Sequence, residues 1–485
     1  MPSTSSPQRL TPAFALLPLL TTACATPLRP PDLGDLYTRA ARIHDTQRNP
    51  VIVIPGILGS KLVDPPTGRV VWGAFAGGYA NPQTPDGARL VALPMQTGRP
   101  LRELRDDVRP AGVLDRLRVD LLFMPVELKA YLNILATLGV GGYRDELLGT
   151  SGAVDYGNDH FTCFQFDYDW RRDNVENARR LHDFILEKRE YVHAELTRRY
   201  GAPGKPVRFD IVAHSMGGLV TRYFLRYGGD ELPDDGDVPV PAWAGAEYVE
   251  KVILIGTPNA GSVEALRELV DGSVIAPILP TYEPAVLGTM PSVYQLLPRP
   301  RHACVVDAAD GRTLIGDFLD PQLWEQMGWG LASPRQDDVL ARLLPDVPDP
   351  AARRAIALDH LRKCLTRARR FFEAIDSPAP PDRPPPAHLR QYLFAGDAVP
   401  TDAVLAAERR GGALRVIHQA PGDRTVLRSS ALMDERLGGQ WSPRLITPIE
   451  WTGVQFIFAD HLGLTKDPAF SDNVLYLLLE SPHHN

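Results

Sequence analysis

Apolar residues occur along this chain in short runs of strand length. The runs are Pro50–Gly56, Phe161–Tyr168, Val207–His214, Val249–Gly256, Arg390–Gly396 and Ala413–Gln419. Several of them are continuous rather than alternating, which is typical of strands that are covered on both faces. Segments with helical periodicity separate or follow them, at Glu127–Leu138, Asn174–Tyr200, Gly217–Tyr227 and Ser471–Leu479. This alternation predicts an α/β fold with a mostly parallel central sheet and helices on both faces.

Two long stretches interrupt the alternation. Residues from 60 to about 125 form an irregular stretch without a clear period, and residues 258–388 are helix-like, charged and broken by proline. We interpret both as insertions on one sheet scaffold that spans residues 49–482. A chain of 485 residues is long enough for one large domain with such insertions.

The charge balance and the residue spacing exclude some function classes. Lys and Arg number 52 and Asp and Glu number 59, which gives a net charge of −7. An acidic chain without a basic block argues against a nucleic-acid partner. No CxxC and no clustered His/Cys spacing is present. We therefore expect no structural zinc site and no metal or organic cofactor.

The N-terminus has the layout of an export signal. Arg9 supplies a positive charge, an apolar run follows from Leu10 to Leu20, and Ala23 precedes Cys24. We predict a signal over residues 1–24 and a linker over 25–48. Cys24 resembles the lipidated cysteine of bacterial lipoproteins, although Thr21 stands where that motif usually has Leu. A lipoprotein, a soluble exported protein and a non-exported protein all remain open. Export would place the protein in the cell envelope, the periplasm or at the outer surface, with Cys24 as the candidate anchor.

Three further cysteines follow. Cys163 lies in a strand-like run and is most simply a small buried hydrophobe. Cys304 and Cys364 could form a disulfide in an exported protein, but the sequence does not set that pairing.

The stretch VRFDIVAHSMGGLVTRYFL places a serine between a strand and a helix. Ser215 has small residues two places to either side, Ala213 and Gly217, as a sharp strand–turn–helix turn requires. Such a turn lifts the serine hydroxyl above the sheet and presents the N–H of Met216 to a developing oxyanion. The positive end of the following helix adds to that effect. We therefore predict that Ser215 is a nucleophile.

A serine nucleophile needs a second oxyanion donor, a base and an acid. In VIVIPGILGS, Gly56 and Gly59 let the chain fold back so that Ile57 presents its N–H. His461 follows the apolar run GVQFIFA and precedes the last helix, which is where the base of an α/β-hydrolase stands. Two carboxylates compete for the acid: Asp397 follows one strand run and Asp423 follows the next. Position alone does not choose between them.

Together these segments resemble the lecithin:cholesterol acyltransferase family, which includes the lysosomal phospholipase A/acyltransferase. The similar segments run in order along the chain: PVIVIPGILGS, YLNILATLGVGGYR, the Tyr-Asp-Trp-Arg signature in FDYDWRRDNVENARRL, VAHSMGGLVTRYFL, VILIGTPNAGSVEAL, MPSVYQLLP and GDRTVLRSSAL. The resemblance implies an α/β-hydrolase fold with cap and lid insertions, in a bacterial-type exported member.

The resemblance also implies roles for residues. It favours Asp423 over Asp397 as the acid, because the family's acid lies in a Gly-Asp-Gly-Thr-Val motif; here Arg424 replaces the second glycine. The triad it implies is Ser215, Asp423 and His461, with the N–H groups of Ile57 and Met216 as oxyanion donors. Trp72 matches a tryptophan of the family's lid, although no cysteine pair lies between Ser60 and Tyr79 to staple it. Residues 60–125 would then be a lid or membrane contact, and 258–388 a cap.

The activity that follows is acyl transfer through an acyl-serine. The resemblance implies a lipid ester, most simply a glycerophospholipid, as donor, with water or an alcohol as acceptor and a membrane surface as partner. Two alternatives stay open: a simple carboxylesterase or triacylglycerol lipase, and a non-catalytic lipid-binding lipoprotein.

Overall fold

A computed structural model describes residues 37–73, 79–114, 116–121, 124–129, 131–149, 160–274, 280–436 and 442–481. The predicted signal, Cys24 and the first part of the predicted linker lie outside these residues. Among the described helices, none combines the length and the apolar character needed to cross a membrane.

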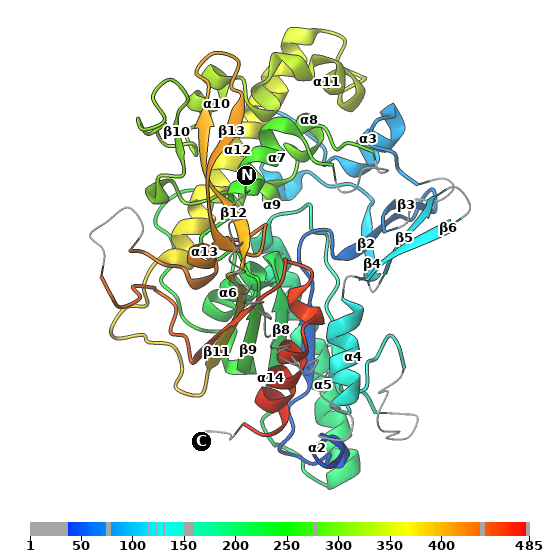
Figure 1. Cartoon of the computed structure of the whole chain (residues 1–485). Coiled ribbons are helices and arrows are strands. Elements are labelled where there is room, and N and C mark those ends of the chain that lie inside the picture. The colour runs from blue at the N-terminus through cyan, green and yellow to red at the C-terminus, as the bar shows by residue number, and fades with distance from the viewer. Residues whose placement is uncertain are drawn as a thin grey trace, which may run out of the picture.

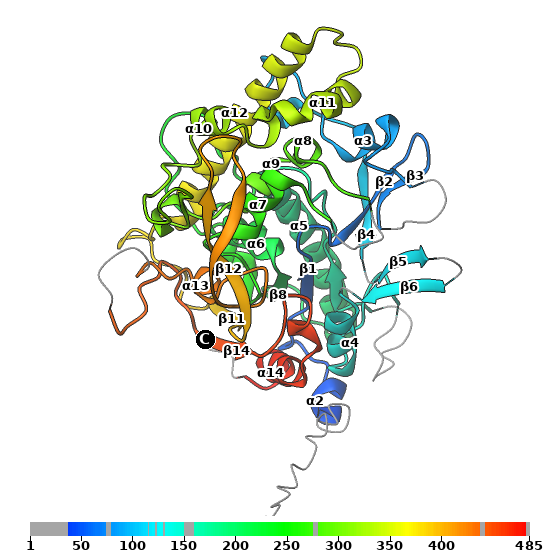
Figure 2. The same cartoon turned by 45° about the horizontal axis from the view of Figure 1, so that its top comes forward.

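Six parallel strands form the central sheet, in the order β14-β11-β9-β8-β1-β7 (Figures 1 and 2). The strands are β1 (Val51–Ile54), β7 (Cys163–Gln165), β8 (Phe209–His214), β9 (Val249–Ile255), β11 (Arg390–Gly396) and β14 (Gly453–Ile457). All five pairings are parallel. The mostly parallel α/β sheet expected from the apolar runs is therefore confirmed.

Helices cover both faces of the sheet, and this explains the continuous apolar runs. Apolar side chains on one face, among them Ile52 and Ile211, pack against α5 (Asn174–Tyr200) and α6 (Met216–Tyr227). Their neighbours in sequence, Val51 and Val212, pack on the other face against α4 (Leu132–Val140) and α14 (Pro468–Leu479).

The first insertion contains more strand than its sequence suggests. It forms a three-stranded sheet, a hairpin and a helix: β2 (Ser60–Asp64), β3 (Arg69–Trp72), β4 (Arg109–Val113), β5 (Arg116–Leu121), β6 (Met124–Lys129) and α3 (Pro85–Val91). The predicted helix over Glu127–Leu138 is therefore wrong in its first turn, where the backbone pairs with β5 instead. These strands lie to one side of the central sheet (Figures 1 and 2).

The second insertion is mainly helical, as predicted, and forms much of the upper part of the molecule in Figure 1. Its described elements are α7 (Val263–Asp271), α8 (Pro284–Leu287), α9 (Pro291–Tyr294), β10 (Val305–Asp307), α10 (Pro321–Met327), α11 (Asp337–Leu343) and α12 (Pro350–Asp376). The lid and cap roles of the two insertions stay predictions.

The predicted strand over Ala413–Gln419 exists but belongs to another sheet. β12 (Val399–Ala407) and β13 (Leu414–Gly422) form an antiparallel hairpin, and β10 from the second insertion adds to β12. The hairpin stands beside α12 and α7 (Figures 1 and 2). It returns the chain to the central sheet at Asp423, just before α13 (Arg428–Leu432).

The described cysteines are all unpaired. Cys163, Cys304 and Cys364 are buried free thiols. The pairing of Cys304 with Cys364 that the sequence left open is therefore absent, and Cys163 is buried as expected.

Candidate active site

Ser215 lies at the tight turn between β8 and α6. Its backbone has φ +53° and ψ −127°, a left-handed conformation that a non-glycine residue adopts at a cost of about 1–3 kcal/mol. The N–H of Ser215 donates to the carbonyl of Ile255 on β9 at 2.8 Å. The turn therefore holds the serine at the carboxyl end of the sheet in one orientation.

Ser215, His461 and Asp423 form a continuous hydrogen-bonded chain. His461 Nε2 lies 3.0 Å from Ser215 Oγ, and His461 Nδ1 lies 2.8 Å from Asp423 Oδ2. The side chains of His461 and Asp423 are 14% and 1% exposed. An ionised carboxylate only accepts hydrogen bonds, so Nδ1 carries the hydrogen and Nε2 is left to accept from the serine hydroxyl. This is the tautomer that a general base requires.

The electrostatics favour an ionised acid beside a basic histidine. Burial disfavours the imidazolium of His461, but the charge and hydrogen bond of Asp423 and the charge of Asp460 outweigh burial and raise the pKa of His461. Burial likewise disfavours the carboxylate of Asp423. The His461 contact and the N–H groups of Val426 and Thr425 outweigh it and lower the pKa of Asp423.

The structure brings Asp423, and not Asp397, to His461. Asp423 Oδ1 accepts from Val426 N–H at 2.7 Å and Thr425 N–H at 3.0 Å, which leaves Oδ2 for the imidazole. Asp397 Oδ1 is buried and has no hydrogen-bond partner in the described part of the chain. Arg424 stands at φ +82°, where the resemblance expects glycine. Its N–H donates to Thr401 Oγ1 at 2.8 Å, which holds the strained turn in place.

Three glycines at strand ends make room for the three side chains. A Cβ on Gly56, which follows β1, would lie 2.6 Å from Ser215 Cβ. A Cβ on Gly256, after β9, would lie 3.1 Å from the His461 ring, and one on Gly396, at the end of β11, would lie 2.6 Å from Asp423 Cβ. Each member of the triad therefore packs against the backbone of a glycine, where a larger residue would not fit.

The segment Pro55–Ser60, called here the oxyanion loop, is held by buried side chains. Tyr168 Oη donates to Pro55 O at 2.8 Å, and Trp72 Nε1 donates to Leu58 O at 2.6 Å. Gly56 N–H donates to Tyr131 Oη at 2.7 Å. Leu58 itself has φ +63°. These contacts fix the backbone from which Ile57 would present its N–H.

The predicted oxyanion donors occupy the expected elements. Ile57 lines the same cavity as Ser215, and Met216 is the first residue of α6. Among the described residues, neither N–H is engaged by another acceptor. Trp72, predicted to lie in a lid, is instead 2% exposed behind the oxyanion loop, with its ring against Trp170 and Tyr282. It does not line the cavity at Ser215.

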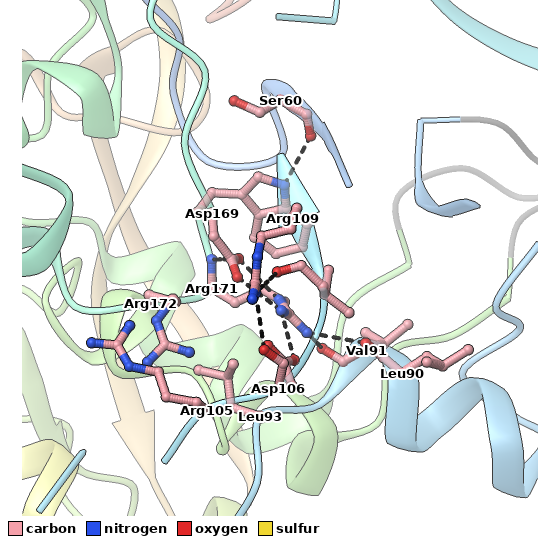
Figure 3. Close-up of polar contacts among 12 residues, drawn as sticks. Ser60, Leu90, Val91, Leu93, Arg105, Asp106, Arg109, Asp169, Arg171 and Arg172 are labelled. Atoms are coloured by element: carbon pink, nitrogen blue, oxygen red, sulfur yellow. Dashed lines mark hydrogen bonds and ion pairs between the residues drawn. The ribbon is translucent and has the colours of Figure 1, made fainter. Parts of the chain in front are cut away.

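The Tyr-Asp-Trp-Arg signature contacts both ends of the same loop, because Tyr168 Oη donates to Pro55 O and Trp170 Nε1 donates to Ser60 O at 3.1 Å. Arg171 is fully buried and binds both oxygens of Asp169, at 2.9 and 2.8 Å. It also binds Asp106 Oδ2 at 2.8 Å and the carbonyls of Leu90 and Val91, as Figure 3 shows. The signature therefore ties the first insertion to the start of α5. Asp106 shows the cost of this burial, which raises its pKa despite the attraction of Arg171.

A cavity of about 100 Å³ opens beside Ser215 and is mostly apolar. The apolar lining comes from the oxyanion loop, the signature, the second insertion and the turn after Asp423: Ile57, Leu58, Trp170, Ala265, Tyr282, Leu287, Met290, Val293, Leu296 and Val426. Larger hollows of about 620 and 670 Å³ contain none of the triad residues. The cavity at Ser215 is smaller, but of these three it is the one that has the nucleophile among mostly apolar lining residues. Within the described ranges, no three His, Cys, Asp or Glu side chains group as metal ligands would.

Sequence reasoning missed two polar residues at the site. The sequence pattern assigns no role to His214, and it includes Tyr131 only as the first residue of the segment YLNILATLGVGGYR. The structure places Tyr131 Oη 3.2 Å from His214 Nδ1, and His214 Nε2 3.2 Å from the carbonyl of His461. Tyr131 lies 83 residues before His214, so only the folded chain reveals this contact.

Comparisons with known proteins show similarity to one family over part of the chain. Residues 148–328 match the family model described as Lecithin:cholesterol acyltransferase. Over 105 residues the chain is 33% identical to the lysosomal phospholipase A and acyltransferase of Canis lupus familiaris, and 31% identical to that of Homo sapiens. These matches cover 22% of this chain and span a fifth of the length of each relative.

Similarity to solved structures extends over more of the chain. The crystal structure of a Tle4–Tli4 complex aligns with 89% of this chain and 98% of its own, with 15% identity and a TM-score of 0.49. The mature lipase BlEst2 of Bacillus licheniformis aligns with 90% of this chain and 94% of its own, with 12% identity and a TM-score of 0.33.

Proposed function

We propose that this chain transfers an acyl group from a lipid ester to water or an alcohol through Ser215. The similarity to the lecithin:cholesterol acyltransferase family model and to the lysosomal phospholipase A and acyltransferase supports this proposal. The observation that carries the proposal is the hydrogen-bonded chain Asp423–His461–Ser215, whose serine lines a mostly apolar cavity. The chemistry of such a chain is nucleophilic attack on a carbonyl carbon.

In the proposed reaction, His461 Nε2 takes the proton of Ser215 Oγ as the oxygen attacks the ester carbonyl. The N–H groups of Ile57 and Met216 would hold the oxyanion, and losing one such donor typically costs about 10²–10³-fold in kcat. His461 then returns the proton to the leaving alcohol, and an acyl-serine remains. Water or a second alcohol gives its proton to His461 and attacks the acyl carbonyl. The bond from that carbon to Ser215 Oγ then breaks, and His461 returns the proton to Oγ, which frees the product acid or ester and restores the serine.

Several features support a lipid ester, and in particular a glycerophospholipid, as the donor. The cavity wall beside Ser215 is apolar and suits an acyl chain. Phe458 and Leu462, three residues before and one residue after His461, are 83% and 47% exposed. Apolar side chains exposed beside a catalytic base suit a protein that works at a membrane surface.

The test uses the protein lacking residues 1–24, phosphatidylcholine liposomes and a lipophilic alcohol, beside the Ser215→Ala variant. Acylated alcohol that disappears in the variant would establish a Ser215-dependent O-acyltransferase. Free fatty acid alone would make the protein a phospholipase, and cleavage of short-chain esters or triacylglycerol alone would make it a carboxylesterase or lipase. If no product exceeds the level of the variant, the protein is a lipid-binding lipoprotein rather than an enzyme.

We also propose that the chain is exported to the cell envelope and anchored through a lipid on Cys24. The supporting observation is the sequence layout of Arg9, the apolar run and Ala23-Cys24. Metabolic labelling with a fatty-acid probe tests it: label should appear on the full chain and be lost in Cys24→Ala. An unlabelled protein recovered outside the cytoplasm would leave soluble export as the answer.

A further inference from the structure

We propose that Tyr131 and His214 are positioning residues: their hydrogen bonds join the oxyanion loop to the backbone of His461 and fix the separation between oxyanion donor and base. This inference rests on the proposed function, because it assigns a role in the same reaction. Neither residue touches Ser215 Oγ or lines the cavity beside it.

The contacts form one path around the nucleophile. Gly56 N–H lies 2.7 Å from Tyr131 Oη, which lies 3.2 Å from His214 Nδ1. His214 Nε2 lies 3.2 Å from the carbonyl oxygen of His461. The path therefore starts one residue before Ile57 and ends on the base itself. In between it passes through the residue next to Ser215.

Each hydrogen on this path can be assigned from chemistry. The carbonyl of His461 only accepts, so His214 Nε2 must carry a hydrogen. Burial and the neighbouring His461 lower the pKa of His214 to about 3, so its other nitrogen is bare. His214 Nδ1 then accepts from the Tyr131 hydroxyl, and the Tyr131 oxygen accepts from Gly56 N–H. Every donor on the path meets an acceptor, and the direction of each bond is unique.

The surroundings make this path rigid. Tyr131 and His214 are 4% and 2% exposed, and their rings meet edge to face with centroids 5.5 Å apart. The His214 ring also lies 4.8 Å from the His461 ring, between centroids. A Cβ on Gly59 would come within 2.7 Å of the Tyr131 ring, so the loop is shaped to receive it. Because both side chains are buried, a hydrogen bond lost here leaves its partner unpaired.

What the path adds is a link between parts that come from distant strands. The oxyanion loop follows β1 and His461 follows β14, at opposite sides of the six-stranded sheet order. Without the path, Ile57 N–H and His461 Nε2 could shift independently while each kept its local contacts. A misplacement of about 1 Å between reacting groups can cost about 10²-fold in rate.

The experiment compares Tyr131→Phe with Tyr223→Phe in the chain lacking residues 1–24. Each substitution removes one buried hydroxyl: that of Tyr131 belongs to the path, and that of Tyr223 donates to Asp230 O at 3.2 Å, near the end of α6. We expect Tyr131→Phe to lose at least as much thermal stability as Tyr223→Phe, because the Tyr131 hydroxyl has two hydrogen-bond partners and the Tyr223 hydroxyl donates one bond. Only Tyr131→Phe should lose kcat, by about 10- to 100-fold, with KM on a soluble ester within twofold. Equal kcat in the two variants would overturn the inference.

A second pair of variants separates positioning from general weakening. His214→Gln keeps an amide that can donate to the His461 carbonyl, whereas His214→Phe keeps the ring volume and no polar atom. We expect His214→Gln to retain more kcat than His214→Phe. Combined with Tyr131→Phe, His214→Phe should lose less than the product of the two single losses, because both changes break one path. Independent, multiplying losses would overturn the inference.

A spectroscopic measurement keeps this inference distinct from the proposed function. Nitrogen NMR of labelled histidine should show His214 as the neutral Nε2–H tautomer at pH 5, with an Nδ1 shift that changes in Tyr131→Phe. A charged His214, or the Nδ1–H tautomer, would overturn the path whatever the activity. An inactive wild-type protein with the expected tautomer would overturn the proposed function and the positioning role, while leaving the hydrogen bonds in place.

Discussion

Replacing Asp423 with asparagine should disable the base without disturbing the fold around it. Asp423 Oδ1 accepts two backbone N–H groups, from Thr425 and Val426, and only an oxygen can stay there. The amide of Asp423→Asn must therefore turn its NH₂ toward His461 Nδ1. An NH₂ group donates, so Nδ1 must accept and the histidine hydrogen moves to Nε2. Nε2 then faces Ser215 Oγ as a donor and cannot take its proton.

The expected loss follows from that forced tautomer. An Asp-to-Asn change that leaves geometry intact but imposes the wrong tautomer costs about 10⁴-fold in kcat in a serine protease triad. We expect a loss of about 10³–10⁴-fold here, with KM within a few-fold. The variant also exchanges a charge-assisted hydrogen bond for a neutral one. A hydrogen bond to a charged group contributes about 1.5–3 kcal/mol to the free energy of unfolding. Because Asp423 is 1% exposed, little of that value is lost to solvent screening.

The assay measures kcat and KM on a soluble ester and the free energy of unfolding in urea. Asp397→Asn is the matched control. Asp397 follows strand β11 of the central sheet, but it is Asp423 that bonds to His461. Asp397→Asn should keep wild-type kcat. Asp423→Asn with more than a tenth of wild-type kcat, or a larger loss in Asp397→Asn, would refute this reasoning.

Four further predictions test other parts of the site. Since the pKa of His461 is raised, kcat/KM should fall as the pH drops through an apparent pKa above about 6.5. A fall in kcat/KM that begins only below about pH 6.5 would contradict this assignment. Gly396→Ala would place its Cβ 2.6 Å from that of Asp423 and should lower kcat at least tenfold, whereas Gly316→Ala, with open space around it, should not. Replacing Phe458 and Leu462 with serine should reduce hydrolysis of liposomal phosphatidylcholine about tenfold and leave a soluble ester unaffected, and equal losses on both would argue against a surface role. In the chain lacking residues 1–24, a thiol reagent should count no reactive cysteine in the native protein and three after denaturation without reductant, because the described thiols are buried and free.

The His461–Asp423 pair also gives stability a pH dependence opposite to that of activity. The pKa of His461 is raised on folding, so its stabilising contribution is full below about pH 6.5 and falls as pH rises through the folded pKa. The pKa of Asp423 is lowered, so its contribution is full above about pH 4 and falls as pH drops through the folded pKa. The pair therefore stabilises the fold most between these limits, where much of the base is protonated and inactive.

The local pattern of apolar and small residues was sufficient to predict the central sheet and the nucleophile. The runs at Val207–His214 and Val249–Gly256 became β8 and β9, and the amphipathic pattern of Asn174–Tyr200 became α5 with the predicted bounds. These elements are specified by their own residues, since each buries an apolar face against a continuous core. The same holds for Ser215, because the small residues and the change of period mark its turn.

Elsewhere, strands and side-chain contacts depend on partners in other segments, and the local pattern did not predict them. Val305–Asp307 is a strand because it pairs with Leu405–Ala407, about a hundred residues away. Met124–Lys129 departs from its helical pattern for a more local reason, because it pairs in a hairpin with Arg116–Leu121. Asp397 and Asp423 look alike in sequence, since both follow strands, and only the folded hairpin between them decides which one reaches His461. The path through Tyr131 and His214 is likewise a product of folding.

The hairpin β12–β13 has a consequence for how substrate can enter. The hairpin carries β10 from the second insertion on β12, the middle strand of this small sheet, and delivers Asp423 at the end of its edge strand β13. The second insertion and the acid are therefore joined through one sheet, and a movement of this sheet as a body would pull the carboxylate away from His461. Substrate access is therefore expected from a part that can move without this sheet. The first insertion is such a part, because its strands belong to other sheets than the hairpin. Evolutionary change in chain length should follow the same division, with residues 60–125 freer to vary than the hairpin that bears the acid.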